Sequence, residues 1–539
     1  MLSKDSPLLW ALDQASWFDI ALAVMFAAFI WYTVSSITAY NRLRHIPGPF
    51  LASFSDIWGF WIMTTSHNAR MNIYGNVMRI GPRSVLTDNP EALMKRNSTP
   101  SKYHRGDWYH SLRMDWRSDN VLSELDTVKH DRRKAKLMSA FSSKRVPYIE
   151  SKIDDWIMAL THTIQKKIEK GEGIMNIGLL LHYFQLDLIT HCAIGTPWGD
   201  LADEQDHFDY LKNTRMLVPS LLAIGWLPFA RGIYMSTWFM SLFGPKTTDK
   251  TGIGRFLGIV EKEVERRFSA DNTDPDTGDD MLGQWIKHGL SPLECQTDLA
   301  LLLPSGSETS VTTFKGILLL LMSSPVVYQR VKREIKNGIA DGRISDPITN
   351  EEAKNLEYMQ AVVREGFRFM SATNVGFVKR ALVDDDVCGV RIPAGTDIFI
   401  NYPAMMRTPE VFGEDAEVFQ PDRFLGGGPN VERMIESVEL MFGHGRFQCL
   451  GKVLVMMELN KMYVQVCTHY QDTCCSFIPW HNHSWACKEP LLTLFQQLLR
   501  HFDFEIKNPE QPWKRDGYGS YVITDFWAKV SVDMDMINT

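Results

Sequence analysis

Residues 441–452 read MFGHGRFQCLGK, so a single cysteine, Cys449, stands among three glycines and directly before an apolar run with helical spacing. Glycine is favoured where a backbone turns sharply or approaches another group closely. A lone cysteine in such a loop is either an inert buried thiol or a reactive thiolate. Other segments of the chain distinguish these two alternatives.

The composition is that of a globular protein with a large core, since 45% of the 539 residues are hydrophobic and 22% are charged. The net charge of -7 leaves no basic footprint, so we expect no nucleic-acid partner. Eight cysteines in so long a chain do not indicate a disulfide scaffold. No CxxC pair occurs among Cys192, Cys295, Cys388 and Cys449, so a structural zinc site has little support.

The N-terminal region contains an uncharged apolar stretch, from Ile20 to Asn41, that is long enough to cross a bilayer. Arg42 and Arg44 follow it, which favours a cytoplasmic position for the rest of the chain. A buried core helix is the alternative. We therefore expect a short luminal N-terminus at 1–17, a transmembrane anchor helix at 18–41, a proline-rich hinge at 42–50 and one large domain over 51–539.

The hydrophobic periodicity of the large domain predicts a mainly α protein with a minor β portion, an α+β fold. Strand-like segments occur at 75–88 and 388–401. The expected helices are 127–141, 150–170, 178–195, 252–269, 292–323, 326–338 and 350–370.

The segment 292–323 is too apolar for a surface helix, so we expect it to run through the core. Pro304 and Gly306 interrupt its middle and favour a kink or a local opening. Glu308 and Thr309 stand beside that point, where a carboxylate needs a partner. By itself this pattern also fits a packing stretch with a satisfied glutamate.

Two further motifs precede the cysteine loop. Glu365 and Arg368 are spaced i, i+3 and can pair on one helical face, and Arg423 follows in a loop. In their order and spacing, these motifs resemble the membrane-anchored cytochrome P-450 family of haem-thiolate monooxygenases. The resemblance covers nearly the whole chain after residue 40 and rests on HDRRKAKLMSAFS (130–142), SGSETS (305–310), EGFR (365–368), PDRF (421–424) and FGHGRFQCLG (442–451). The C-terminal segment further resembles fungal members of the pisatin-demethylase-like branch.

The resemblance implies a role for each residue of the cysteine loop. Cys449 would be the proximal ligand of the haem iron, and its thiolate favours O–O cleavage. Phe442 would cover the sulfur, and Gly451 would let the following helix approach the porphyrin. The start of that helix supplies N–H groups that stabilise a thiolate. Glu308 and Thr309 would be the acid–alcohol pair that delivers protons during oxygen activation.

The haem propionates would be contacted by His130, Lys134, Arg380 and Arg446. The chain departs from the family here, because the family usually has arginine two residues before the cysteine and this chain has Phe447. Lys134 also stands where arginine is common, and it supplies charge without a bidentate fork. Glu365, Arg368 and Arg423 would form a structural triad rather than a catalytic one.

The function that the resemblance implies is insertion of one oxygen atom from O2 into an apolar small molecule in fungal secondary metabolism. Haem would be the cofactor, with NADPH electrons supplied by a partner NADPH-cytochrome reductase. The expected location is the endoplasmic reticulum membrane, single-pass, with the haem domain on the cytoplasmic side. The alternatives are a haem-thiolate isomerase or dehydratase that needs no reductase, and a non-haem enzyme or sensor that uses Cys449. Substrate selection is expected from about 100–125, 205–245, 300–312 and 371–379.

One segment, 466–496, does not fit the family pattern. It contains four cysteines and three histidines, but neither a helical period nor a clear metal-ligand spacing. We interpret it as a translated intron. A genuine surface insertion and a zinc-binding segment are the alternatives, and sequencing of the transcript distinguishes them.

Overall fold

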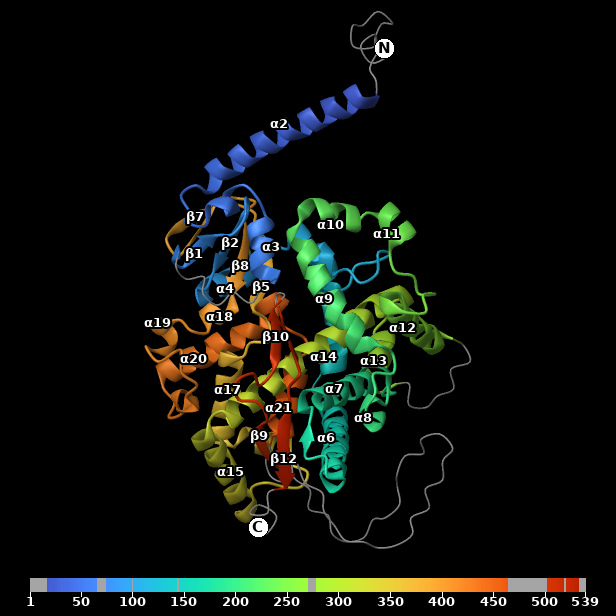
Figure 1. Cartoon of the computed structure of the whole chain (residues 1–539), viewed down its shortest axis with the longest axis vertical. Helices are drawn as coiled ribbons and strands as arrows, with labels where there is room; N and C mark the ends of the chain where they lie inside the picture. The colour runs from blue at the N-terminus through green and yellow to red at the C-terminus, as the bar shows by residue number, and fades with distance from the viewer. Residues whose placement is uncertain are drawn as a thin grey trace, which may run out of the picture.

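The computed structural model describes residues 17–64, 74–98, 100–142, 145–269, 278–463, 502–517 and 520–532. Helices make up most of these residues, and short strands in small sheets are a minor part, so the predicted mainly α architecture with a minor β portion is confirmed (Figure 1). The atypical segment 466–496 lies outside the described residues, and its interpretation stays a prediction.

Helix α2 (Trp17–Leu43) extends away from the body and carries the apolar N-terminal stretch (Figure 1). Its side chains are widely exposed, with Phe26 at 64% and Trp31 at 72%. Its last turn packs on the body, because Leu43 is fully buried and Arg42 donates to the carbonyl of Ala394. The helix is therefore attached to the rest of the protein through its C-terminal half, where Tyr32 also donates to the carbonyl of Phe54, and many of its apolar side chains are exposed.

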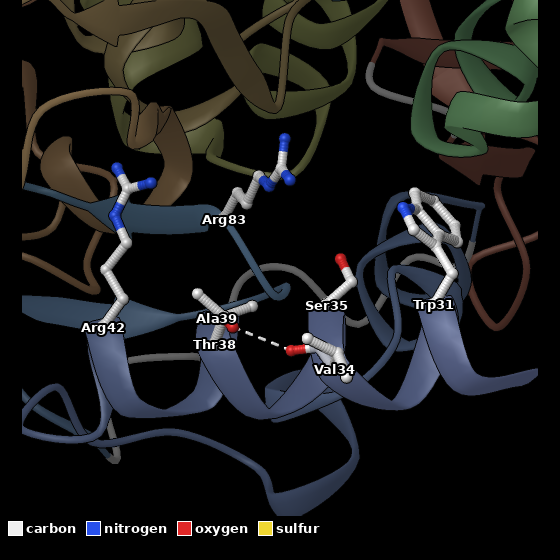
Figure 2. A pocket seen from close by; sticks show the side chains of 7 residues that line it. All are labelled: Trp31, Val34, Ser35, Thr38, Ala39, Arg42 and Arg83. Atoms are coloured by element: carbon white, nitrogen blue, oxygen red, sulfur yellow. Dashed lines mark hydrogen bonds between the residues drawn. The ribbon is translucent and has the colours of Figure 1, made fainter.

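A cavity of about 280 Å³ separates α2 from the body. Figure 2 shows Trp31, Ser35 and Arg42 projecting from α2 toward Arg83. The guanidinium of Arg42 is already bound by backbone carbonyls of residues 393 and 394. The cavity thus lies along the line where the N-terminal helix meets the body.

The largest sheet has five strands in the order β1-β2-β8-β5-β3. Strands β2 and β8 are parallel, and the other pairs are antiparallel. A register shift between Gly376 and Lys379 bends β5. The five strands are β1 (Val77–Arg79), β2 (Ser84–Thr87), β3 (Tyr103–His104), β5 (Val375–Ala381) and β8 (Asp397–Asn401).

Three smaller sheets complete the β portion in the described ranges. One is the hairpin β6 (Asp385–Val387) and β7 (Val390–Ile392), and another is the hairpin β10 (Lys514–Gly517) and β11 (Tyr521–Thr524). The third has the order β4 (Ile174–Met175), β12 (Ala528–Val532) and β9 (Phe502–Ile506). The C-terminal strands thereby return to the helical body.

The long helices of the body include those predicted at 127–141, 150–170, 178–195, 252–269, 292–323 and 326–338, each within four residues of its expected bounds. Around the core the long helices are α5 (Thr127–Leu137), α6 (Val146–Glu169), α7 (Ile177–Ile194), α9 (Tyr210–Trp226), α12 (Gly252–Phe268), α14 (Pro292–Met322), α15 (Pro325–Ala340), α17 (Glu357–Phe369) and α21 (Lys452–Met462). Shorter helices are α3 (Ile57–Thr64), α4 (Pro90–Asn97), α8 (Asp200–Asp203), α10 (Pro228–Tyr234), α11 (Thr237–Phe243), α13 (Met281–Lys287), α16 (Asn350–Lys354), α18 (Tyr402–Met405), α19 (Pro409–Phe412) and α20 (Pro429–Glu439). The 3₁₀ turns are η1 (Phe50–Ser53), η3 (Asp107–Leu112), η4 (Met138–Phe141), η6 (Pro421–Phe424), η7 (Leu440–Phe442) and η8 (Gly445–Phe447).

The single helix expected at 350–370 is wrong, because the structure has two helices there, α16 and α17. A capping box of Thr349 and Glu352 starts the first. The second is capped from another element, since the carboxylate of Glu334 accepts from the N–H groups of Tyr358 and Met359, each at 2.8 Å. A cap supplied by a distant residue leaves no local trace in the sequence.

Helix α14 is the central helix, and it begins with a capping box of Ser291 and Glu294. It continues without interruption through Pro304, so the expected local opening does not break the helix. Helix α7 packs beside it closely enough that a Cβ on Gly306 would lie 3.0 Å from Ile189. Among the described helices, α7 has the length and composition of a membrane span, yet 89% of that window is buried inside the protein. It is therefore a core helix.

The predicted pair of Glu365 and Arg368 is fully buried, with two contacts of 2.6 and 2.7 Å. Arg423 joins it at 3.2 Å from Glu365. Arg368 and Arg423 also donate to backbone carbonyls in the segment 406–418. The three side chains thereby fix α17 and η6 to the meandering loop that precedes the cysteine loop.

Candidate active site

The cysteine loop is a tight turn that depends on glycine. The Cys449 N–H donates to the carbonyl of Phe442 at 2.7 Å. Gly443 and Gly445 have φ values of 75° and 56°, which side-chain-bearing residues rarely adopt. A Cβ on Gly443 would lie 2.9 Å from the Phe447 carbonyl oxygen, and one on Gly445 would lie 2.9 Å from that of Asn97. The loop can therefore fold under the sulfur only with glycine at these positions.

The sulfur of Cys449 receives hydrogen bonds from the start of helix α21. Burial raises the pKa of the thiol, whereas the N–H of Gly451, the charge of Lys134 and the N–H of Lys452 oppose that rise. The accessible surface of Cys449 faces a cavity, because the side chain lines that cavity and protein surrounds it on the other sides. The two N–H groups and the lysine therefore favour the thiolate, the form that ligates a metal, against the effect of burial.

The cavity has a volume of about 460 Å³ and reaches from the cysteine loop to helix α14. Cys449 lines it together with Gly306, Glu308 and Thr309. Cys449 and the middle of the central helix thus face the same cavity.

The lining of this cavity comes from all four segments expected to select the substrate. Most of the lining side chains are apolar, as in small-molecule sites. The contributing residues include Trp108, Leu112, Met114, Val121 and Leu122 from the first segment, Leu221, Leu222 and Trp226 from the second, Leu301 and Leu302 from the third, and Ala372 and Val375 from the fourth.

One end of the cavity carries buried basic side chains, some of whose nitrogens have no hydrogen-bond partner. Lys379 Nζ has no hydrogen-bond partner, and neither has the Nε of Arg96 or of Arg105. Burial, and after it the charges of Arg105 and Arg96, lower the pKa of Lys379 to about 5. Such a cluster is costly unless an anion completes it. These unsatisfied nitrogens could donate to the carboxylates of a flat cofactor bound beside Cys449.

Of the predicted propionate contacts, His130 and Lys134 line the cavity. The His130 Nδ1 lies 2.9 Å from Asp131, and burial lowers its pKa to about 4. Lys134 donates to the carbonyls of Arg446 and Gln448, each at 2.7 Å. It therefore braces the backbone of the cysteine loop.

The other two predicted contacts do not line the cavity. Arg380 binds Asp397 at 2.8 Å and Asp107 at 3.0 Å, and Arg446 binds Asp131 at 3.1 Å. Adjacent residues of a strand point to opposite faces, so β5 turns Lys379 inward and Arg380 outward. The side chain of this strand that lines the cavity is therefore that of Lys379, the neighbour of Arg380. Alternation along the strand indicates that only one of these two neighbouring side chains faces the cavity, but it does not show which one.

Phe447 lines the cavity where the family usually has arginine. The Arg105 guanidinium lies 4.7 Å from the centre of its ring. Arg105, from the segment before η3, was not among the predicted site residues. A basic residue in a loop carries no local sign that it is buried, so sequence reasoning could not select it.

Glu308 and Thr309 both line the cavity, and they are held differently. The Thr309 hydroxyl donates to the Ser305 carbonyl at 2.7 Å. Glu308 lies 3.1 Å from the Nε2 of His182, on helix α7. Phe442 packs edge-on against Phe367 beside the loop, with ring centres 5.2 Å apart.

The fold and this site define a class, and the chain belongs to the cytochrome P450 family, whose model matches residues 67–477. The chain is similar to cytochrome P450 monooxygenase aba1 of Botryotinia fuckeliana, at 32% identity over 91% of this chain and 92% of that protein. Cytochrome P450 monooxygenase abl1 of Leptosphaeria maculans is also 32% identical, over 98% of this chain and 89% of the relative. Pisatin demethylase of Fusarium vanettenii is a more distant relative, at 22% identity over 86% and 89%.

The protein is thus a fungal cytochrome P450 monooxygenase, and the family implies a thiolate-ligated haem. The donor set fits that group, because a cysteine sulfur with N–H support lies at the cavity floor and orphaned cations lie at its edge. The expected monooxygenase class is confirmed. A non-haem enzyme built on a nucleophilic Cys449 does not agree with this membership.

Proposed function

We propose that Cys449 ligates the haem iron and that an apolar natural product is oxygenated in the cavity above it. The observation that carries this proposal is that Cys449, Glu308 and Thr309 line one cavity. The test is the absorption spectrum of the reduced, carbon monoxide-treated protein. The Soret band typical of thiolate ligation is expected in the wild type and is lost in Cys449→Ser. A bound haem without that band would identify a different ligand.

A thiolate-ligated haem, when bound, activates dioxygen and supplies one oxygen atom to the substrate. The residues of this chain would contribute binding, orientation and proton supply. Phe442 and Gly451 would shield the sulfur and allow close approach. Glu308 and Thr309 would hold the proton that is needed as the second oxygen leaves as water.

We assign the propionates to Arg105 and Lys379, with His130 and Lys134 beside them. Two carboxylates would complete the unsatisfied nitrogens of this cluster. Phe447, in place of the usual arginine, would offer a ring face to these cations rather than a charge of its own.

The substrate is proposed to be a small apolar metabolite of fungal secondary metabolism. The apolar lining supports a substrate recognised by shape and hydrophobic contact. Relatives at 31–32% identity are the monooxygenases named aba1, abl1 and ABA1, and the similarity to pisatin demethylase is weaker. The proposed placement in a pisatin-demethylase-like branch is therefore a distant relationship. Metabolite comparison of a deletion strain would identify the substrate.

The electron source is proposed to be NADPH through a membrane-bound reductase. Product formation should require both the reductase and NADPH. Product formed without either would instead support the alternative, an isomerase or dehydratase that uses the same haem.

Residues 18–41 are proposed to anchor the protein in the endoplasmic reticulum membrane, with the haem domain on the cytoplasmic side. The exposed apolar side chains of α2 support this arrangement. Helices α10 and α11, at the same end of the molecule (Figure 1), carry further exposed apolar residues. These are Phe229, Trp238, Leu242 and Phe243, at 59–83% exposure.

A further inference from the structure

Two buried titratable side chains outside the cavity lining connect to Glu308. The Nε2 of His182 lies 3.1 Å from the Glu308 carboxylate. The Nζ of Lys315 lies 3.2 Å from the Nδ1 of the same ring and donates to the carbonyl of Ile523 at 2.9 Å. His182 and Lys315 are 1% and 2% exposed. A carboxylate, an imidazole and an ammonium thus form one line from the cavity into the core.

The order of these groups fixes the direction of each hydrogen bond. An ammonium can only donate, so the Nδ1 of His182 accepts from Lys315. The proton of the neutral ring then stands on Nε2 and is donated to Glu308. Burial lowers the pKa of His182, which keeps the ring neutral. The positive charge of Lys315 therefore supports the carboxylate through an oriented, uncharged ring.

The charges around Glu308 oppose the effect of burial. Burial by itself raises its pKa, but His182, Lys315 and Arg215 together bring the pKa below the usual value. Burial lowers the pKa of Lys315 to about 7, while the charge of Glu308 raises it. The groups that face Glu308 are thus His182 from α7, Lys315 from α14, and Arg215 and Tyr210 from α9.

We propose that Lys315 and His182 are positioning residues for Glu308, which hold it as an oriented carboxylate and set the pH at which it becomes protonated. This inference rests on the proposed role of Glu308 in proton supply. The hydrogen bond to His182 holds the Glu308 carboxylate against α7. Glu308 must therefore break this hydrogen bond before it can deliver a proton into the cavity.

The test is a pH titration of the full-length enzyme by infrared difference spectroscopy, which detects the carbonyl stretch of a protonated carboxyl group. The band that disappears in Glu308→Gln belongs to Glu308. In Lys315→Met its midpoint should rise by about 1–3 pH units, the range for loss of an opposite charge nearby. Arg215 remains in that variant, so the midpoint shifts and the titration persists. Lys315→Arg keeps the charge and should restore the midpoint.

A matched control is Lys332→Met, which removes another buried lysine, 5% exposed, that extends from α15 and binds Asp503 of β9. It should destabilise the protein and leave the Glu308 midpoint unchanged. If Lys315→Met does not fold, His182→Leu and His182→Gln test the same series of hydrogen bonds. The glutamine amide can still donate to Glu308, whereas leucine cannot. An unchanged midpoint in every folded variant would overturn the inference. The carbon monoxide spectrum of each variant reports the Cys449 ligation separately, so a failure of the proposed haem site is recognised independently.

Discussion

The ammonium nitrogen of Lys379 lies 2.8 Å from the centre of the Phe447 ring, with no hydrogen-bond partner. A buried lysine in this position is charged only if an anion or a ring face supports it. The ring stands where the family usually has arginine, and the basic side chain at this edge of the cavity comes from strand β5 instead of the cysteine loop. An anion bound here would favour the charged form of that side chain.

Replacement of Lys379 by methionine is therefore expected to weaken haem retention while it stabilises the cofactor-free protein. Burial lowers the pKa of Lys379 to about 5, well below that of the unfolded chain. The unfolded state then binds more protons between that pH and about 10, the ordinary lysine value. Below about pH 10 the lysine is protonated in the unfolded state and still neutral in the folded state, so the free energy of unfolding decreases as the pH falls through this window. Methionine cannot take up a proton and avoids this loss of stability. The gain should grow as the pH falls toward about 5, in addition to roughly 1–3 kcal/mol from removal of a buried unsatisfied donor.

Thermal unfolding of the cofactor-free protein at several pH values measures the stability, and the haem content after gel filtration measures retention. Arg380→Met is the control, because its side chain points to Asp397 and Asp107. It should lower the stability and leave haem retention unchanged. Haem loss in Arg380→Met, together with normal haem retention in Lys379→Met, would show that Arg380 is the propionate contact.

Removal of the Thr309 hydroxyl by Thr309→Ala should separate oxygen consumption from product formation. The hydroxyl lines the cavity and its backbone bond to Ser305 is local, so the fold should survive. Loss of a positioned proton donor typically costs about 10²–10⁴-fold in rate. We expect the carbon monoxide band to persist, with product per O2 reduced and hydrogen peroxide increased. An unchanged product yield would remove Thr309 from the proton path.

Breaking the buried pair of Glu365 and Arg368 should strongly destabilise the protein, although the substitution does not alter its surface. Both side chains have 0% exposure, so Glu365→Gln leaves a buried guanidinium without its charge partner. The expected loss is about 3–5 kcal/mol of unfolding free energy. Asp422→Asn is the control, since its pair with Arg330 is 44–48% exposed and should be worth about 0–1 kcal/mol. Denaturant titration of both variants measures the difference.

A methyl group on Gly443 should disrupt the cysteine loop beyond the cost of its backbone angle. Gly443 has φ 75° and would place a Cβ 2.9 Å from a carbonyl oxygen, whereas Gly426 has φ 81° with no atom within 4 Å of such a Cβ. Gly426→Ala should therefore cost only the left-handed strain of about 1–2 kcal/mol. Gly443→Ala should cost more and also reduce the thiolate-type carbon monoxide band. Equal effects would show that the loop yields to the methyl group.

Deletion of residues 1–38 is expected to reduce membrane association but not abolish it. The deletion spares the last turn of α2, where Ala39 and Leu43 are buried against the body. Residual binding should come from exposed Phe229, Trp238 and Phe243, and serine at these three positions in the deletion variant should release the protein. Flotation with lipid vesicles measures both steps. Full release by the deletion alone would restrict the anchor to α2.

The sequence predicted much of the fold because its evidence is local. Apolar spacing located α6, α7, α12 and α14 to within a few residues, since the period of a helix is written in adjacent positions. It failed at 350–370, where the cap of α17 comes from Glu334 on another helix. It also could not show that Lys379 rather than Arg380 lines the cavity, because alternation along a strand leaves both orientations equally consistent with the pattern.

By itself, the sequence determined the glycine turn around Cys449, the order of the motifs and the family to which the chain belongs. These depend on residues close together in the chain, where backbone angles and spacing decide the geometry. The tertiary structure decided which charges meet: Lys379 at the cavity edge, and His182 with Lys315 behind Glu308. These contacts join segments more than 100 residues apart, for instance 182 and 308. Burial and partner charge, which set protonation, exist only after those segments have packed together.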